Sequence, residues 1–177
     1  MSILKVARMG HPVLRAKARP LEKADLKRAA LQQFIDDMME TMAEYHGVGL
    51  AAPQVHQGLR VFVASLNVDD REDGESDPEP IALINPEIAV VGTDVVEDWE
   101  GCLSIPDVRG RVPRAREIRV RAMDRNGSRL ELVAHDFPAR VIQHETDHLD
   151  GVLFLDRMRS LETLTFLDEY SRYWVKD

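Results

Sequence analysis

Residues 143–148 carry the chemistry that can be read most directly from residue spacing. They place His144, Glu145 and His148 in an HExxH pattern. On an α-helix, residues four positions apart lie one turn above each other on the same face, so the two imidazoles can bind one divalent metal ion. Glu145 then lies beside the ion, where its carboxylate can take a proton from a metal-bound water molecule. The pattern predicts metal-assisted hydrolysis, provided that the segment is helical and has a third ligand.

The residues around the motif favour a helix. Asp136 or Phe137 is placed to cap its start, and Pro138 is tolerated in the first turn because its missing N–H group would have no partner there. Gly151 is a suitable end. The apolar faces consist of Val141, Ile142 and Leu149. A buried helix with two ordinary histidines is the weaker alternative on this stretch.

The third ligand has several candidates. A catalytic zinc-type site has three protein ligands and one open position. The extended pattern HExxHxxGxxH fails here because Phe154 stands at its last position. Glu162 or Glu169 would complete a site of the general peptidase type, whereas Cys102 would complete a Cys/His/His set. The residues alone leave these alternatives open.

Length and composition limit the class of protein. The 177 residues predict one domain over residues 1–177, and the single cysteine excludes an internal disulfide. The formal net charge of −8 argues against a nucleic-acid-binding function, because phosphate contacts need a basic surface. We interpret the arginines concentrated at residues 109–121 as solvated strand residues. Without a signal peptide or a membrane-spanning run, the sequence predicts a cytoplasmic protein that does not bind membranes.

The segments that must position the motif alternate between helical and strand patterns. Residues 25–45 predict a long N-terminal amphipathic helix. Its apolar positions are Leu26, Ala30, Phe34, Met38, Met42 and Tyr45. Strand patterns follow at residues 59–66 and at residues 81–91, and Asn85-Pro86 interrupts the second of them. Residues 118–134 predict a hairpin with its turn at Asn126-Gly127. An acidic run at residues 68–80 predicts a mobile loop. Without repeated β–α–β units, we predict an α+β fold with antiparallel or mixed β-sheets around a central HExxH-bearing helix.

Residues 47–54, GVGLAAPQ, have an unusual composition for a core element. Small residues let another backbone approach closely, and Gln54 supplies an amide that can donate to an oxygen atom. The segment precedes a strand pattern, so we expect a structured loop. We interpret the remaining loop histidines as polar, surface or capping residues rather than ligands. These are His11, His46 and His56.

Three segments together resemble the signature motifs of the peptide deformylase family. They are GVGLAAPQ at residues 47–54, EGCLS at residues 100–104 and QHETDH at residues 143–148, in the order typical of that family. The similarity extends to residues 10–15 and to the arginine-rich and hairpin region, so it spans most of the chain. The resemblance implies a metal-dependent hydrolase that removes the formyl group from the N-terminal formylmethionine of nascent polypeptides and releases formate.

The resemblance also implies roles for individual residues. The metal ligands are Cys102, His144 and His148. A water molecule in the fourth position attacks the formyl carbon, with Glu145 as general base and then general acid. Gln54 and the backbone N–H group of Leu103 stabilise the oxyanion. The substrate-binding residues are Val48, Gly49, Glu100, Gly101, Arg109, Phe137 and Val141.

Within this substrate-binding set, Gly49 and Gly101 bind the peptide backbone as an added strand. The methionine side chain enters an apolar pocket lined by Val48, Leu103, Phe137 and Val141, with Glu100 near its rim. Arg109 contacts substrate residues further along the peptide. The chain departs from a simple apolar pocket in two places. These are Asp98 and Arg140.

The implied cofactor is one divalent metal ion. A thiolate with two imidazoles accepts iron(II), zinc, nickel or cobalt, and the resemblance favours iron(II) in the cell. The implied partners are N-formylmethionyl nascent peptides and the ribosome that carries them. Some deformylases dock on the ribosome through a long basic C-terminal helix, but residues 161–174 are short and not basic, so this docking is not transferred. We expect a packed terminal helix there, with Leu164, Leu167 and Tyr170 on one side.

Two other kinds of protein could use the same residues. A general HExxH peptidase would use Glu162 or Glu169 as the third ligand, and replacement of Cys102 would leave its metal bound. A non-catalytic, metal-stabilised binding protein would need a fourth protein ligand, which is not evident, and would have no use for Glu145 or Gln54.

Overall fold

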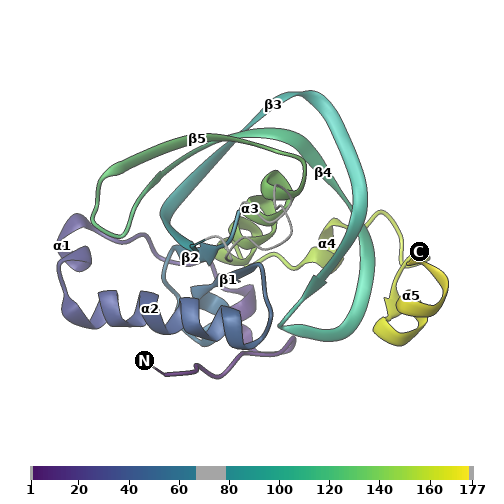
Figure 1. The fold of residues 1–177 in the computed structure, drawn as a ribbon, viewed down its shortest axis with the longest axis horizontal. Helices are drawn as coiled ribbons and strands as arrows, with labels where there is room; N and C mark the ends of the chain where they lie inside the picture. The colour runs from purple at the N-terminus through teal and green to yellow at the C-terminus, as the bar shows by residue number, and fades with distance from the viewer. Residues whose placement is uncertain (1, 67–78, 176–177) are drawn as a thin grey trace.

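The computed structural model describes residues 2–66 and 79–175. Figure 1 shows helix α3 (Asp136–Leu149) enclosed by a strongly curved sheet. The acidic run predicted as a mobile loop lies almost entirely outside the described residues, apart from its last two positions. Among the described residues, no helix has both the length and the hydrophobicity needed to cross a membrane.

The sheet is antiparallel throughout. Its strands are β1 (Gly49–Ala51), β2 (Val61–Ala64), β3 (Ile81–Cys102), β4 (Ile105–Met123) and β5 (Arg129–His135), hydrogen-bonded in that order, while β6 (Thr165–Phe166) pairs with β4. The β4–β5 hairpin turns at residues 124–128, as the Asn-Gly signal predicted. The prediction of an α+β fold with an antiparallel sheet is therefore confirmed.

The predicted strand at residues 81–91 was too short. β3 continues through Asn85 and Pro86. Proline has no backbone N–H group to donate to the neighbouring strand, and the register shift between Ile84 and Glu87 accommodates this loss. The side chain of Asn85 also exchanges two hydrogen bonds with the backbone of Leu21, of 2.9 and 2.7 Å. These bonds hold the N-terminal arm against the irregular part of the strand.

The predicted N-terminal helix was wrong in its continuity and at two positions of its apolar face. It is divided into α1 (Lys23–Leu26) and α2 (Ala29–Glu44), because Arg28 adopts an extended backbone conformation and caps the second helix. Ala30 and Tyr45 are exposed. The buried apolar face of α2 is Leu31, Ile35, Met38 and Met42.

Two helices cover opposite faces of the short strands β1 and β2. On β2, Phe62 and Ala64 belong to the core beneath α3, whereas Val61 and Val63 pack with the apolar face of α2. This alternation is the normal consequence of a period of two along a strand. Helix α3 therefore packs against one face of β2 along much of its length. Its N-cap residue is His135, one position before the predicted cap.

The remaining elements are short. They are the 3-10 helices η1 (Pro12–Arg15) and η2 (Ala52–Val55), and the helices α4 (Phe154–Arg157) and α5 (Leu167–Tyr173). The predicted packed terminal helix was only partly right, because α5 has no buried residue and Leu164 lies before its start. His11 and His56 cap η1 and η2, and their rings contact each other at a centroid distance of 4.7 Å.

Candidate metal centre and substrate pocket

The end of β3 and the last turns of α3 bring three potential metal ligands together. The sulfur of Cys102 lies 3.3 Å from Nε2 of His148, and the ligand atoms of Cys102, His144 and His148 lie within 4.8 Å of one another. One thiol and two imidazoles are the donor types that zinc and iron(II) accept, so this set fits a divalent metal ion. Within the ranges that the structure describes, it is the one group of this kind.

The two glutamates considered as alternative third ligands lie outside this group. Glu162 accepts a hydrogen bond from Ser160 of 3.5 Å, and Glu169 pairs with Arg172 at 3.1 Å. Both belong to the C-terminal segment rather than to the centre formed by β3 and α3. The geometry therefore favours Cys102 over either glutamate.

The electrostatic environment favours an ionised thiol. Burial alone would raise the pKa of Cys102, but the neighbouring imidazoles of His148 and His144 hold this pKa well below its ordinary value. Burial alone would lower the pKa of His144, but its contact with Cys102 raises this pKa well above the ordinary value. A thiolate is the form of cysteine that binds metal ions.

Glu100 orients one of the three potential ligands. Its Oε2 lies 2.8 Å from Nδ1 of His144, which leaves Nε2 as the nitrogen available to a metal ion. Glu100 is one of the residues that line the cavity, and its side chain is buried. Burial alone would raise the pKa of Glu100, yet hydrogen bonds with Arg114 and His144 hold it well below its ordinary value.

A buried ion-pair network surrounds Glu100. Arg114 donates to both of its carboxylate oxygens at 2.9 and 3.0 Å, and to Asp147 at 2.5 Å. Arg140 donates to Glu100 at 2.8 Å, and Arg157 donates to Asp147 at 2.7 Å. Only 5 % of Arg114 is exposed, so its interpretation as a solvated strand residue was wrong. Its two carboxylate partners supply the charge that makes burial tolerable.

Arg140 is part of the pocket wall rather than a free charge in the pocket. Its guanidinium also donates to the backbone oxygens of Val112 at 2.8 Å and Val96 at 2.7 Å. With these acceptors and Glu100, the buried cation is satisfied from within the protein. This explains how a polar residue is accommodated where the sequence suggested an apolar one.

Glu145 is buried directly beside the ligands. Burial raises its pKa, and although the two histidines oppose this, the pKa rises to about 6. Its Oε2 has no hydrogen-bond partner within the described part of the chain. Gly49 makes room for it, since a Cβ atom there would lie 2.8 Å from Cγ and Cδ of Glu145. A carboxyl group with a pKa near neutrality is suited to accept a proton and return it.

Gln54 is held with its amide directed at the centre. Its Oε1 accepts a hydrogen bond of 2.8 Å from the backbone N–H group of Ala51, which fixes the side chain. Its Nε2 lies 3.4 Å from the sulfur of Cys102 and 3.3 Å from Oγ of Ser104. Leu103 follows Cys102 in the turn between β3 and β4, so its backbone N–H group is adjacent to the same centre.

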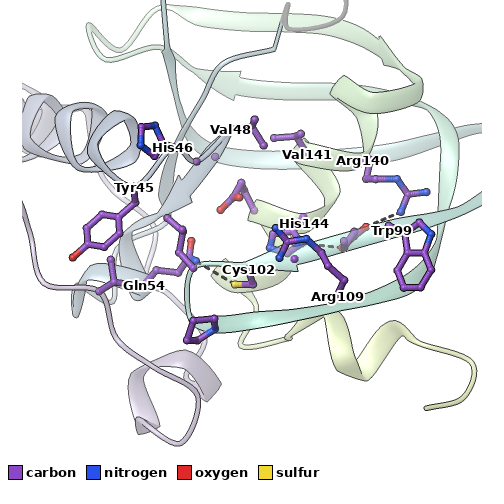
Figure 2. A pocket seen from close by; sticks show the side chains of 18 of the residues that line it. Tyr45, His46, Val48, Gln54, Trp99, Cys102, Arg109, Arg140, Val141 and His144 are labelled. Carbon is purple, nitrogen blue, oxygen red and sulfur yellow. Dashed lines mark hydrogen bonds and ion pairs between the residues drawn. The ribbon is translucent and has the colours of Figure 1, made fainter. Parts of the chain in front are cut away.

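One cavity of about 680 Å³ contains the predicted substrate-binding positions. They are Val48, Gly49, Glu100, Gly101, Arg109, Phe137 and Val141. Figure 2 shows Gln54, Cys102 and His144 near the middle, with Tyr45 and Trp99 at opposite ends. Over Gly101 lies the guanidinium of Arg109, so close that a Cβ atom would lie 2.8 Å from its Nε. The two glycines thus mark where the side chains of Glu145 and Arg109 come closest to the backbone of the cavity wall.

Sequence reasoning missed several residues of this cavity. They are Lys5, Val6, Arg8, Tyr45, His46, Trp99 and Pro106. His46 is exposed, as expected, but it also lines the cavity. Most of these residues come from the N-terminal arm and the end of α2, which only the tertiary fold brings to the site. Local spacing holds no signal for them.

Comparisons with known proteins agree with this geometry. The family described as polypeptide deformylase matches residues 3–164. Peptide deformylase 2 of a Nostoc species is 44% identical over 176 residues, covering 99% of this chain and 97% of that protein. The Met-Ala-Ser-bound structure of class I type b peptide deformylase from Acinetobacter baumannii has a TM-score of 0.81 and 39% identity, and covers 89% of this chain and 100% of that chain. For peptide deformylase from Thermotoga maritima the TM-score is 0.80 at 37% identity, covering 90% of this chain and 100% of that chain. The chain therefore belongs to the polypeptide deformylase family.

Proposed function

We propose that this chain removes the formyl group from N-formylmethionyl nascent peptides, with Glu145 as the group that moves the proton. The chain is a metal-dependent peptide deformylase, as its family membership implies. The observation that carries the assignment of roles is the Cys/His/His donor set with Glu145 beside it at one cavity. Neither a peptidase with a glutamate ligand nor a closed structural metal site accounts for both features.

The ligands would be Cys102, His144 and His148, with Glu100 orienting His144. A divalent ion held there would act as a Lewis acid, which makes water more acidic and polarises a carbonyl oxygen. We propose iron(II) as the ion used in the cell, with zinc, nickel and cobalt as ions that the same donors accept. The thiol of Cys102, which favours its ionised form, and the two buried imidazoles support a borderline-to-soft metal rather than magnesium or calcium.

Glu145 would take the proton of the attacking water and then deliver it to the departing α-amine of methionine. The carboxylate must be ionised for the first step and protonated for the second, and a pKa near neutrality allows both. Its burial keeps bulk water from competing for the proton. Gly49 supports this role because it leaves space for the carboxyl group.

The developing oxyanion would be stabilised by two donors. Gln54 offers Nε2, which Ala51 orients through Oε1, and Leu103 offers its backbone N–H group. Donors fixed before the reaction need no reorganisation in the transition state, which is why such groups contribute strongly to catalysis. The hydrogen bond from Ala51 is the contact that supports this preorganisation.

The methionine side chain would enter the apolar part of the cavity, formed by Val48, Leu103, Phe137 and Val141. The peptide backbone would lie along Gly49 and Gly101 as an added strand, with Arg109 contacting later residues. The Acinetobacter relative with bound Met-Ala-Ser supports a peptide of this kind as the ligand. Because nascent chains are the substrate, we place the activity in the cytoplasm, near the ribosome.

The decisive experiment measures formate release from N-formyl-Met-Ala-Ser by iron- or nickel-loaded protein. Glu145→Ala should lose about 10²- to 10⁴-fold in kcat, the usual contribution of a general base, with its metal content unchanged. Glu169→Ala is the matched control, because Glu169 is a potential ligand outside the centre, and it should retain full activity. A fully metallated wild type that releases no formate would contradict the proposed function.

A further inference from the structure

The segment after residue 164 lies beyond the part of the chain that the family description matches. It contains β6 and α5, which lie against the outer side of the β3–β4 pair (Figure 1). The proposed mechanism uses none of its residues. Nevertheless, it contacts two residues that line the substrate cavity, Trp99 and Arg109.

The first contact is an aromatic cluster on Trp99. The ring of Tyr170 meets the Trp99 ring edge-on at a centroid distance of 4.9 Å, and the Trp174 ring lies at 5.3 Å. Both distances lie in the range of favourable aromatic pairs. Trp99 is only partly buried and stands at one end of the cavity (Figure 2). Its two aromatic neighbours therefore limit where the indole can lie.

The second contact is a backbone pairing. In β6, Thr165 and Phe166 pair with Arg109 and Val108 of β4. Nearby, Oγ1 of Thr163 accepts a hydrogen bond of 3.1 Å from the backbone N–H group of Arg111. The strand segment that carries Arg109 is therefore tied to the C-terminal segment by main-chain bonds. Arg109 in turn covers Gly101.

These contacts fall on one stretch of the cavity. Trp99 precedes Gly101 by two residues on β3, so it lies about 7 Å farther from Cys102 along the strand. A peptide that aligns with Gly101 and has its formyl group at the metal ligands reaches Trp99 with residues that follow methionine. The aromatic cluster thus lies beside the distal part of the peptide and not beside the reacting bond.

We propose that Tyr170 and Trp174 are positioning residues, which hold Trp99 as the cavity wall for the substrate residues that follow formylmethionine. This inference rests on the proposed function. It assigns the C-terminal segment a role in peptide affinity and none in the chemical step. Loss of an aromatic neighbour would let the Trp99 indole move, so that the peptide would bind less tightly while Glu145 and the metal ligands stayed in place.

Kinetics with N-formyl-Met-Ala-Ser test this role through the separation of KM from kcat. Tyr170→Ala should raise KM about 3- to 10-fold, the effect of losing one aromatic pair, with kcat changed less than about twofold. Tyr170→Phe keeps the ring and should restore the wild-type KM. Tyr173→Ala is the matched control on the same helix, because Tyr173 is 68% exposed and its ring contacts Arg172 instead of Trp99.

A binding measurement keeps this test separate from catalysis. The chain has two tryptophans, Trp99 and Trp174, so intrinsic fluorescence reports directly on the cluster. Titration of metal-loaded protein with Met-Ala-Ser should change the fluorescence, and Tyr170→Ala should weaken this binding by the same factor as KM. This readout does not depend on formate release, so failure of the proposed function would leave it interpretable.

Several results would overturn the positioning role. One is a KM and a Met-Ala-Ser affinity that Tyr170→Ala leaves unchanged. Another is a loss confined to kcat, which would place the effect on the chemical step. A third is an equal loss in Tyr173→Ala, which would show that disturbing α5 is sufficient. Near-ultraviolet circular dichroism checks that each variant retains the native packing. If Tyr170→Ala does not retain this packing, the KM and the peptide affinity of Tyr170→Phe are compared with those of the wild type instead.

Discussion

Replacing Arg114 by methionine should destabilise the protein strongly, although arginine on a strand often faces solvent. The side chain is 5% exposed and makes three short hydrogen bonds to two carboxylates. Methionine keeps an unbranched apolar stem in place of that of arginine and removes the guanidinium group with its charge. The substitution therefore isolates the ion-pair network from simple packing.

The magnitude follows from the partners that remain. Hydrogen bonds to charged groups contribute about 1.5–3 kcal/mol each, and breaking a buried ion pair costs about 3–5 kcal/mol. After the substitution, Glu100 keeps Arg140 and Asp147 keeps Arg157, so neither carboxylate is left without a cation. We therefore expect a loss of about 3 kcal/mol in the free energy of unfolding, at the lower end of that range.

Urea unfolding of the metal-free protein measures this loss without a contribution from metal binding. Arg116→Met is the matched control on the same strand. Arg116 pairs with Asp136 at 2.9 Å, but both side chains are more than half exposed, so the expected change is within about 1 kcal/mol. Arg114→Lys should restore little, because a single ammonium cannot donate to two carboxylates with the geometry of a guanidinium. Equal losses in Arg114→Met and Arg116→Met would refute the reasoning.

Three further outcomes are expected. Gly49→Ala should reduce kcat more than about tenfold, because the added methyl group would displace the carboxyl group of Glu145. Gly58→Ala should leave kcat unchanged, because an added Cβ atom there would have no neighbour within 4 Å. An equal kcat in the two variants would contradict the close approach of Glu145 to Gly49. Cys102→Ala should abolish stoichiometric metal binding, whereas Glu162→Ala should retain it, as measured by metal analysis after dialysis. The reverse result would favour the ligand set of a peptidase with a glutamate ligand. A divalent metal ion at 100 times its dissociation constant should raise the free energy of unfolding by about 2.7 kcal/mol, as measured by urea unfolding. An unchanged urea midpoint would argue against a site that forms only in the folded state.

The sequence revealed those parts of the site that depend on short spacings. His144 and His148 lie on one helical face because they are four residues apart, and this geometry needs no tertiary information. The glycines of the GVGLAAPQ segment indicated a close approach, but the group that lies against Gly49 is the side chain of Glu145 and not another backbone. The choice of Cys102 over two glutamates came from the resemblance, because the sulfur is separated from the histidines by more than forty residues.

The parts that sequence reasoning missed depend on contacts between distant segments. Arg114 looks like its solvated neighbours along the strand, and only the approach of α3 turns it into a buried cation. The break between α1 and α2 at Arg28 is a local feature, but the apolar residues on both sides fit one helical spacing and concealed it. Charge and periodicity do not identify a partner that lies across the fold.

Stability and metal binding should be coupled through the same buried network. Arg114 and Arg140 hold Glu100, and Glu100 orients His144, so disturbing Arg114 should also weaken metal affinity. Losing such support to a metal ligand typically costs about 10- to 100-fold in affinity, which corresponds to about 1.4–2.7 kcal/mol. The penalty of Arg114→Met measured in saturating metal should therefore exceed the metal-free penalty by that amount.

Arg157→Met separates this coupling from a general loss of stability. Arg157 donates to Asp147 at 2.7 and 3.1 Å, so it belongs to the network without forming a bond to Glu100. Its penalty should be the same with and without metal, since the orientation of His144 does not depend on it. If Arg114→Met also shows equal penalties in the two conditions, Glu100 orients His144 without help from Arg114, and the network serves stability alone.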